Sequence, residues 1–299
     1  ERGLRHRRAI EVVSFTNEEG VRFDPAIMAS GVLAGKFTRD WVYGRRDEDG
    51  HTFREELERI GYMGSESNRP RRIHAYLEPH IEQGPTLESE GLSLAAVDGI
   101  LGRQRMYATL SGQPQHAGTS PMRTRRDAMV AAARAVVGIR DLALEYPDPV
   151  VATVGYIKAV PGVVSQIPAR VTISTDIRHP TAEGLDDITS RADELVRRIA
   201  LEERVGVEIE VTTRTGPVAF DLAMVDLVAE SIREIGLPVR RMTSGSGHDS
   251  KFIASIAPTS MLFARTIGGM SHCETEAIDW TDAHLAAEAL LHAALRLAE

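Results

Sequence analysis

The feature of this sequence that most constrains its fold is the order of the predicted strands and helices, which changes twice along the chain. The first part alternates between apolar runs with strand character and segments with helical periodicity. The predicted strands span 9–16, 73–81 and 92–100, and the predicted helices span 25–33 and 52–60. Because strands that alternate with helices favour a parallel arrangement, this part predicts an α/β fold with a mixed, mostly parallel sheet.

A different order is predicted between about Arg103 and Arg214. The elements there follow the sequence strand, helix, strand, strand, helix, strand, and they span 105–111, 122–146, 150–158, 169–177, 182–204 and 206–213. This is the split βαβ order of ferredoxin-like domains. Alternation resumes after Gly216-Pro217, with a helix over 221–235, a strand over 259–264 and a helix over 281–298. The sequence therefore predicts one domain over 1–102 and 216–299, interrupted by a smaller inserted domain over 103–215.

Composition excludes several classes of protein. The 299 residues carry a net charge of −8, which disfavours a nucleic-acid partner because phosphate binding needs a concentrated basic surface. No apolar run approaches the roughly 18 residues that span a bilayer, so no membrane partner is expected. A single cysteine, Cys273, fits a reducing cytoplasm. The chain opens on Glu1, just before a strand that looks internal, so we expect that an N-terminal part is missing.

Two adjacent carboxylates follow the first predicted strand. Glu18 and Glu19 lie in the sequence Phe-Thr-Asn-Glu-Glu-Gly, at the carboxyl end of 9–16. Open α/β sheets bind ligands at this edge. Adjacent like charges repel unless a cation or a proton lies between them, so one glutamate is a candidate metal ligand and the other a candidate proton carrier. The alternative is a solvated acidic turn.

Histidines stand at the ends of two further predicted strands. His80 lies in His-Ile-Glu-Gln-Gly-Pro, which closes 73–81, and His272 lies in the loop Gly-Gly-Met-Ser-His after 259–264. Imidazole is the commonest protein metal ligand. A hydrogen-bonded core histidine is the alternative for His80. We interpret the neighbouring Cys273 as a residue without a chemical role, because no base is identifiable beside it.

Three more clusters are candidates for ligand contacts. His116 precedes Thr119 and Ser120, either of which can cap the helix over 122–146, and Pro121 suits the first turn of that helix. His116 would then lie before the positive end of the helix. Arg178, at the end of 169–177, can bind a carboxylate with two hydrogen bonds or pair with Asp176 as a structural ion pair. The third cluster is the glycine-rich Ser-Gly-Ser-Gly-His-Asp-Ser, in which His248 and Asp249 line the site or brace it.

Together and in this order, the motifs resemble the carbamoylase and allantoate amidohydrolase branch of the dinuclear metallopeptidase superfamily, which also holds aminoacylases and carboxypeptidases. The segments that carry the resemblance run through the whole chain: FTNEEGVRF, HIEQGP, GQPQHAGTSPM with RRDA, TDIRHP, SGSGHDS and GGMSH. It implies a phosphorylase/hydrolase-like catalytic domain and a ferredoxin-like lid and dimerisation domain. It also implies two divalent metal ions (zinc, manganese, cobalt or nickel) per subunit of a homodimer.

The resemblance implies a role for each residue at the metal site. Glu18 would be the general base, and Glu19 a metal ligand. His80 and His272 would be ligands to different metals of the pair. Gln83 would contact the ureido group of the substrate.

Further residues are implied to bind the substrate or the reacting group. His116 would reach from the inserted domain into a partner subunit's site and stabilise the tetrahedral intermediate. Arg178 would bind the substrate carboxylate, with Arg105 as an additional contact. Ser165 stands where the family usually has an asparagine that helps to hold the substrate, and His248 is a further candidate contact.

The implied activity is hydrolysis of the carbamoyl C–N bond of N-carbamoyl-L-amino acids or related ureido acids such as allantoate, with release of ammonia and carbon dioxide. An aminoacylase-like amidase or peptidase is the alternative within the class. The second alternative is a catalytically inactive truncated homologue, because the histidine and bridging aspartate that the family carries upstream of Glu18 have no counterpart in this chain.

Overall fold

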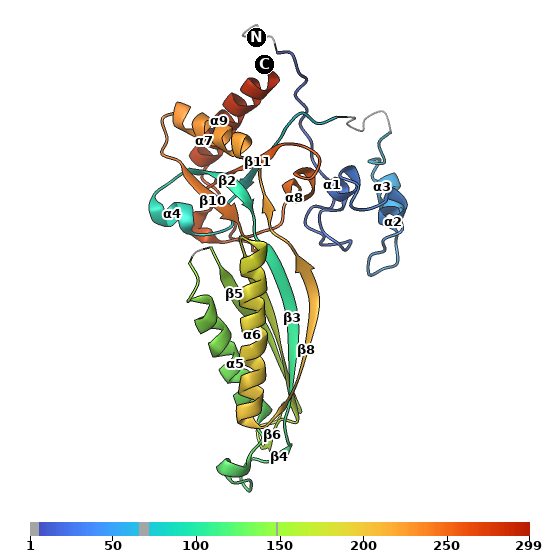
Figure 1. Ribbon diagram of the computed structural model, residues 1–299. Coiled ribbons are helices and arrows are strands. Elements are labelled where there is room, and N and C mark those ends of the chain that lie inside the picture. Colours follow the sequence, from blue (N-terminus) through green and yellow to red (C-terminus); the bar gives the residue numbers. More distant parts are fainter. Residues whose placement is uncertain (1–5, 66–71, 148) are drawn as a thin grey trace. The chain divides into compact units, whose positions relative to one another are not determined.

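A computed structural model describes residues 6–65, 72–147 and 149–299 of the chain (Figure 1). The chain folds into two compact units, one over residues 1–100 and 218–299 and the other over residues 101–217. Within the described residues, no helix combines the length and the apolar character that crossing a membrane requires.

The first unit is built on a mixed sheet with the strand order β1-β11-β2-β10, and β9 also pairs with β2. Its strands are β1 (Tyr76–Ile81), β2 (Leu94–Ile100), β9 (Val218–Ala219), β10 (Arg240–Ser244) and β11 (Thr259–Ala264). The two longest pairings, β1 with β11 and β2 with β10, are parallel, and the shorter pairings of β2 with β11 and β9 are antiparallel. The expected mixed α/β sheet is therefore confirmed.

Two long helices cover this sheet, α7 (Leu222–Glu234) and α9 (Trp280–Ala298). They pack against each other and against β11, whose six residues are all buried (Figure 1). The apolar core joins β2 and β11 to α7 and α9. Every residue of β11 is buried because this strand lies inside the sheet.

Short helices lie outside the sheet in the same unit. They are α1 (Met28–Leu33), α2 (Arg39–Tyr43), α3 (Phe53–Arg59), α4 (Thr86–Glu90) and α8 (Ser250–Ile253). A separate apolar cluster that includes Phe23, Met28 and Phe53 ties the first three together. A capping box begins α3, since Thr52 and Glu55 accept each other's backbone N–H.

The strand expected over residues 9–16 is wrong. Residues 9–15 form no strand, and Val12 is 99% exposed. An apolar run forms a strand only where another strand satisfies its backbone hydrogen bonds, and none of the described strands pairs with this segment. The β-branched composition was a sound indicator of strand propensity, but propensity without a pairing partner does not make a strand.

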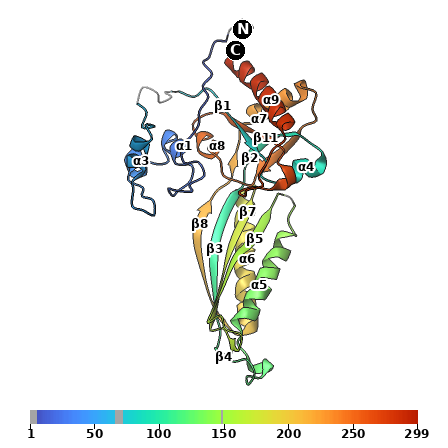
Figure 2. The same ribbon diagram turned by 180° about the vertical axis from the view of Figure 1, so that it is seen from behind.

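The second unit contains a four-stranded antiparallel sheet with the order β5-β7-β3-β8. Its main strands are β3 (Gly102–Ser111), β5 (Val151–Val160), β7 (Arg170–His179) and β8 (Gly206–Thr215). The helices α5 (Ala128–Ala143) and α6 (Ala182–Glu203) lie side by side against one face, where alternate residues of β3 and β7 are buried (Figures 1 and 2). Along the chain the main elements run β3-α5-β5-β7-α6-β8, as the split βαβ order predicts.

The start expected for α5 is wrong. Asp127, rather than Thr119 or Ser120, caps this helix, and its carboxylate accepts hydrogen bonds from the Met129 and Val130 amides. Residues 122–124 form only a short 3₁₀ turn. A carboxylate at the N-cap satisfies two unpaired amides of the first turn, so the helix begins where that acceptor is available.

Candidate metal-binding and catalytic site

The turn that carries Glu18 and Glu19 is held by its own side chains and backbone. Asn17 adopts a left-handed conformation with φ 59°. Its side-chain amide donates to the carbonyl oxygens of Phe23 at 2.9 Å and Pro25 at 3.2 Å. The Ile27 amide donates to the Glu18 carbonyl oxygen at 2.9 Å. These bonds fold residues 17–27 back on themselves, which fixes the backbone beneath the two carboxylates.

The carboxyl end of β1 presents His80 with a defined tautomer. The Nδ1 atom of His80 lies 2.8 Å from the carbonyl oxygen of Ile81, which can only accept a hydrogen bond. Nδ1 must therefore carry the proton, so that Nε2 of the neutral ring keeps its lone pair. A carbonyl partner of this kind is typical of histidines that bind metals.

Residues after His80 shape the loop that follows β1. Gln83 has φ 59°, and its backbone N–H donates to the Thr266 hydroxyl at 3.0 Å. The buried Glu82 carboxylate accepts from the Thr86 and Leu87 amides, both at 2.8 Å, so it caps α4. Glu82 is therefore a structural residue, although it stands two positions from His80.

The loop after β11 presents His272 in a left-handed conformation with φ 56°. The Glu276 carboxylate fixes this loop because it accepts from the Ser271 hydroxyl at 2.8 Å and from the His272 amide at 3.0 Å. Gly269 lies so close to the loop after β1 that an added Cβ atom would come within 2.7 Å of the Pro85 nitrogen. The two loops are thus packed backbone to backbone.

These three segments converge. The Oε2 atom of Glu19 lies 3.8 Å from Nε2 of His272, and that nitrogen lies 3.3 Å from Nε2 of Gln83. Asn17, Gln83 and His272, all with positive φ, lie in the three converging turns. Unfavourable backbone conformations that gather in this way often mark functional sites.

Glu18, which precedes Glu19, has a raised pKa. Partial burial raises the pKa of Glu18 to about 7, with further contributions from the charges of Glu19, Asp249 and Glu78. Four carboxylates are therefore close enough to disfavour full ionisation in the absence of a cation. A carboxyl group with a pKa near 7 suits proton transfer at neutral pH.

His248 and Asp249 lie behind the site and are buried. The His248 ring packs on the His80 ring with centroids 4.4 Å apart, and its Nε2 atom lies 2.8 Å from the Ser244 hydroxyl. Burial, followed by the nearby His80, lowers the pKa of His248 to about 3, so the ring is neutral. With 1% of its surface exposed, His248 braces His80 in this structure.

In the second unit, a charged cluster lies on the sheet face opposite α5 and α6. Asp176 accepts hydrogen bonds from Arg105 on β3 and from Arg178 on β7, each at 2.8 Å, and these contacts lower its pKa in opposition to burial. Arg103 stands directly across from Arg178 in the strand register. Three guanidinium groups around one carboxylate leave a net positive charge that favours an anion.

His116 and Ser165 are neighbours in the second unit. His116 lies in β4 (Gln115–His116), which pairs with β6 (Gln166–Ile167), and the Ala117 amide donates to the Ser165 carbonyl oxygen at 2.8 Å. His116 is exposed, and its Nδ1 atom accepts from the Gly118 amide at 3.0 Å. In the neutral ring, Nε2 then carries the proton and is available as a donor. The expected position before the N-terminus of α5 is wrong, because that helix begins only at Ala128.

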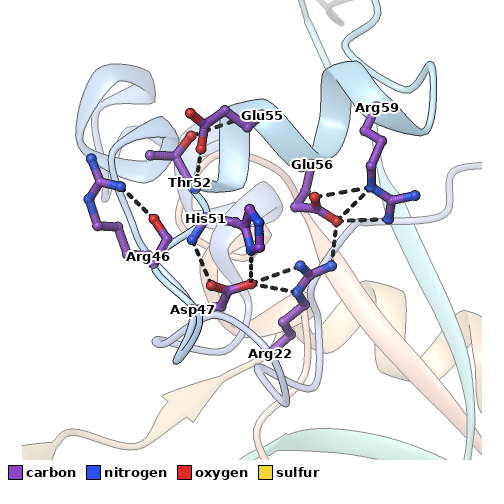
Figure 3. Close-up of polar contacts among 9 residues, drawn as sticks. Arg22, Arg46, Asp47, His51, Thr52, Glu55, Glu56 and Arg59 are labelled. Carbon is purple, nitrogen blue, oxygen red and sulfur yellow. Dashed lines mark hydrogen bonds and ion pairs between the residues drawn. The ribbon is translucent and has the colours of Figure 1, made fainter.

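Another group of possible ligands was not anticipated from the sequence. Asp47, Asp49 and His51 hold ligand atoms within 4.8 Å of one another, and they form the only such trio within residues 6–65, 72–147 and 149–299. Figure 3 shows Asp47 in an ion pair with Arg22 (2.8 Å), and Arg22 also contacts Glu56. Because a guanidinium group already neutralises Asp47, the trio is explained as a loop-stabilising network.

The mixed sheet, together with the turns that bring Glu19, Gln83 and His272 close to one another, favours a metallopeptidase-like hydrolase. The profile of Peptidase family M20/M25/M40 matches residues 1–296, and the chain belongs to this family. Members of the family depend on metal ions.

Individual similar proteins have more specific names than the family. The chain is 37% identical to an N-carbamoyl-L-amino-acid amidohydrolase of Rhizobium meliloti over 99% of this chain and 71% of the relative. It is 35% identical to the allantoate amidohydrolase of Escherichia coli K12 over 92% of this chain and 67% of the relative. A crystal structure of a hydantoinase/carbamoylase family amidase from Burkholderia multivorans superimposes with a TM-score of 0.92 at 41% identity, over 95% of this chain and 69% of that one.

Proposed function

We propose that this protein hydrolyses the carbamoyl C–N bond of N-carbamoyl-L-amino acids or of related ureido acids such as allantoate. The observation that carries the proposal is the convergence of Glu19, Gln83 and His272, with a glutamate of pKa about 7 beside Glu19. Relatives that bear the names of carbamoyl-amino-acid and allantoate amidohydrolases support the choice of substrate. The products are ammonia, carbon dioxide and the freed amine.

Glu19, His80 and His272 fit divalent cations. His80 is held in the tautomer that leaves Nε2 unprotonated, and the carboxylates around Glu18 form an excess of negative charge that a cation would neutralise. Imidazole and carboxylate suit zinc, manganese, cobalt or nickel, and we propose two ions per subunit. Divalent cations, when bound, supply Lewis acidity that makes water easier to deprotonate near neutral pH.

Glu18 is the general base in this proposal. Its carboxylate accepts a proton from the attacking water and later returns a proton to the leaving nitrogen.

Gln83 and the arginine cluster would select the substrate. Gln83, whose Nε2 atom lies 3.3 Å from Nε2 of His272, would contact the ureido group. Arg178 and Arg105 would bind the substrate carboxylate, supported by the net positive charge around Asp176. Ser165, at the position of the family's asparagine, would also help to hold the substrate.

His116 would donate from Nε2 to the developing oxyanion of the tetrahedral intermediate, since its Nδ1 atom is already an acceptor. We propose that it acts in the site of a partner subunit within a homodimer formed by the inserted unit. The free edge of β5 supports this interface, because Val151, Tyr156 and Ile157 are exposed there and β5 pairs only with β7 among the described strands.

The proposal is tested by turnover of N-carbamoyl-L-amino acids and allantoate against N-acetyl-L-amino acids, each with added manganese, cobalt or zinc. Release of ammonia from the ureido substrates alone is the expected result. Turnover of only the acetyl substrates would show an aminoacylase-like amidase instead. Absence of all turnover in protein that contains metal would favour the inactive homologue.

A further inference from the structure

The segment His248-Asp249-Ser250 contacts two separate parts of the site unit, β1 and α1. The His248 ring packs on His80, and the Ser250 amide donates to the Glu78 carboxylate at 2.7 Å. Glu78 lies on β1 two residues before His80. Asp249 instead accepts a hydrogen bond from the hydroxyl of Ser30 on α1. All three residues of the segment are buried, and none of their contacts is explained by the chemistry assigned to Glu18 and Glu19.

The contact between Ser30 and Asp249 joins elements from opposite ends of the sequence. Ser30 is completely buried and lies in α1, and Asp249 is 5% exposed and immediately precedes α8. The side chain of Asp249 makes no capping bond to α8, although aspartate at this position usually does so. Its carboxylate is thus directed toward α1.

The backbone at the start of α1 and one hydrogen bond link Ser30 to Glu18. Ile27, which immediately precedes α1, donates its amide to the Glu18 carbonyl oxygen at 2.9 Å. Gly247 lies next to Ile27, since a Cβ atom on this glycine would come within 3.4 Å of the Ile27 side chain. A displacement of α1 from α8 would therefore shift the backbone that carries Glu18.

We propose that Asp249 is a positioning residue, which holds the Glu18–Glu19 turn in register with His80 through its hydrogen bond to Ser30. This inference rests on the proposed function, in which Glu18 is the general base. The same segment contacts the strand of His80 through His248 and Ser250, so one buried tripeptide fixes both halves of the site. Such supporting contacts matter because catalytic groups tolerate displacements of only about 0.5 Å.

The test compares Asp249→Ala, Asp249→Asn and Ser30→Ala with the wild-type protein. Asparagine keeps an oxygen that accepts from Ser30, whereas alanine removes it. We expect Asp249→Ala and Ser30→Ala to lower kcat about 10- to 100-fold while KM stays within about threefold. Asp249→Asn should restore kcat to within about fivefold of wild type. Equal losses in Asp249→Ala and Asp249→Asn, or no loss in either, would overturn the proposal.

Ser231→Ala is the matched control. Ser231 is also a completely buried helical serine, and its hydroxyl donates to the Leu227 carbonyl oxygen at 2.9 Å, far along the chain from Glu18. This variant should keep the wild-type kcat. A loss equal to that of Ser30→Ala would mean that any buried serine hydroxyl matters through stability alone, which contradicts positioning.

Hydrogen–deuterium exchange supplies a readout that needs neither metal nor substrate. The Ile27 amide should exchange about tenfold faster in Ser30→Ala and Asp249→Ala than in wild type, and at the wild-type rate in Ser231→Ala. Unchanged exchange at Ile27 would refute the positioning role. If the wild-type protein hydrolyses no ureido acid, the proposed function fails, but the exchange rates still decide whether Asp249 holds the turn.

Discussion

The Oε2 atom of Glu19 lies 3.8 Å from the Nε2 atom of His272, although these residues belong to opposite ends of the sequence. Each side chain is presented by a turn with a left-handed residue, Asn17 on one side and His272 itself on the other. The loop of His272 is further tied to that of Gln83 by the close approach of Gly269 to Pro85. Local backbone geometry and long-range packing therefore cooperate to bring Glu19, Gln83 and His272 together.

The first prediction separates the roles of the two adjacent glutamates. Glu18→Gln should leave the metal content unchanged and lower kcat by about 10²- to 10⁴-fold, because the amide cannot accept the proton. Elemental analysis and ammonia release measure the two quantities. Glu58→Gln on the exposed face of α3 serves as an isosteric control. If Glu18→Gln instead loses its metal, Glu18 is a ligand and the two roles are reversed.

The second prediction concerns recognition of the substrate carboxylate. Arg178→Ala should raise KM for N-carbamoyl-L-amino acids about 10- to 100-fold, since a charge-assisted hydrogen bond contributes about 1.5–3 kcal/mol. An N-carbamoyl amine without a carboxylate is the control substrate, and its kcat/KM should not change. An unchanged KM for the amino-acid substrate would remove Arg178 from the site and leave its ion pair with Asp176 as a structural contact.

Most of the fold was predictable because its long elements have strong local signals. The strand over 259–264 and the helix over 182–204 agree with β11 and α6 to within one residue. The failures share a physical cause. The run over 9–16 has strand composition but no pairing partner among the described strands, and α5 begins at a carboxylate that competes successfully with the earlier Thr119 and Ser120.

The candidate site was predictable only where a motif marks it. Glu18, Glu19, His80 and His272 each stand within four residues of a glycine, in turns or at strand ends, and such patterns are visible in a sequence. Ser30 gives no signal, because a serine within an apolar helical pattern does not reveal a partner on a remote loop. Likewise, Glu276 fixes the His272 loop through two hydrogen bonds that only the fold brings together.

The third prediction tests the packing between the loops of Gln83 and His272. Gly269→Ala should destabilise the fold by about 2 kcal/mol or more and weaken metal binding, because it adds a clash with Pro85 to the strain of φ +62°. Gly35→Ala isolates the strain, since φ there is +75° but nothing lies within 4 Å of the added Cβ. Thermal unfolding and metal titration measure both effects. Equal destabilisation by the two substitutions would show that the loop contact contributes nothing.

The fourth prediction follows from the raised pKa of Asp249. Burial, with a smaller contribution from the Glu78 charge, raises this pKa to about 6, while the hydrogen bond from Ser30 opposes the shift. The protonated form is favoured in the folded state, so this contribution to stability is present below the pKa of the unfolded chain and is lost as pH rises through about 6.

Asp249→Asn should remove that dependence. Between pH 4 and pH 7 the variant should therefore gain about 2 kcal/mol of unfolding free energy relative to wild type, as measured by denaturant titration at each pH. Ser231→Ala should keep the wild-type dependence, since it changes no ionisable group. A difference between Asp249→Asn and wild type that stays constant over this range would contradict the raised pKa.

The last prediction concerns the start of α5. Asp127→Ala should lower the free energy of unfolding by about 1 kcal/mol, because its carboxylate accepts from the Met129 amide at 2.9 Å and the Val130 amide at 3.3 Å. Thr119→Ala and Ser120→Ala should change it by less than about 0.5 kcal/mol, since neither side chain caps the helix. Denaturant titration of the three variants distinguishes the two starts: a larger loss at Thr119 or Ser120 than at Asp127 would mean that the helix begins earlier and that its positive end lies beside His116.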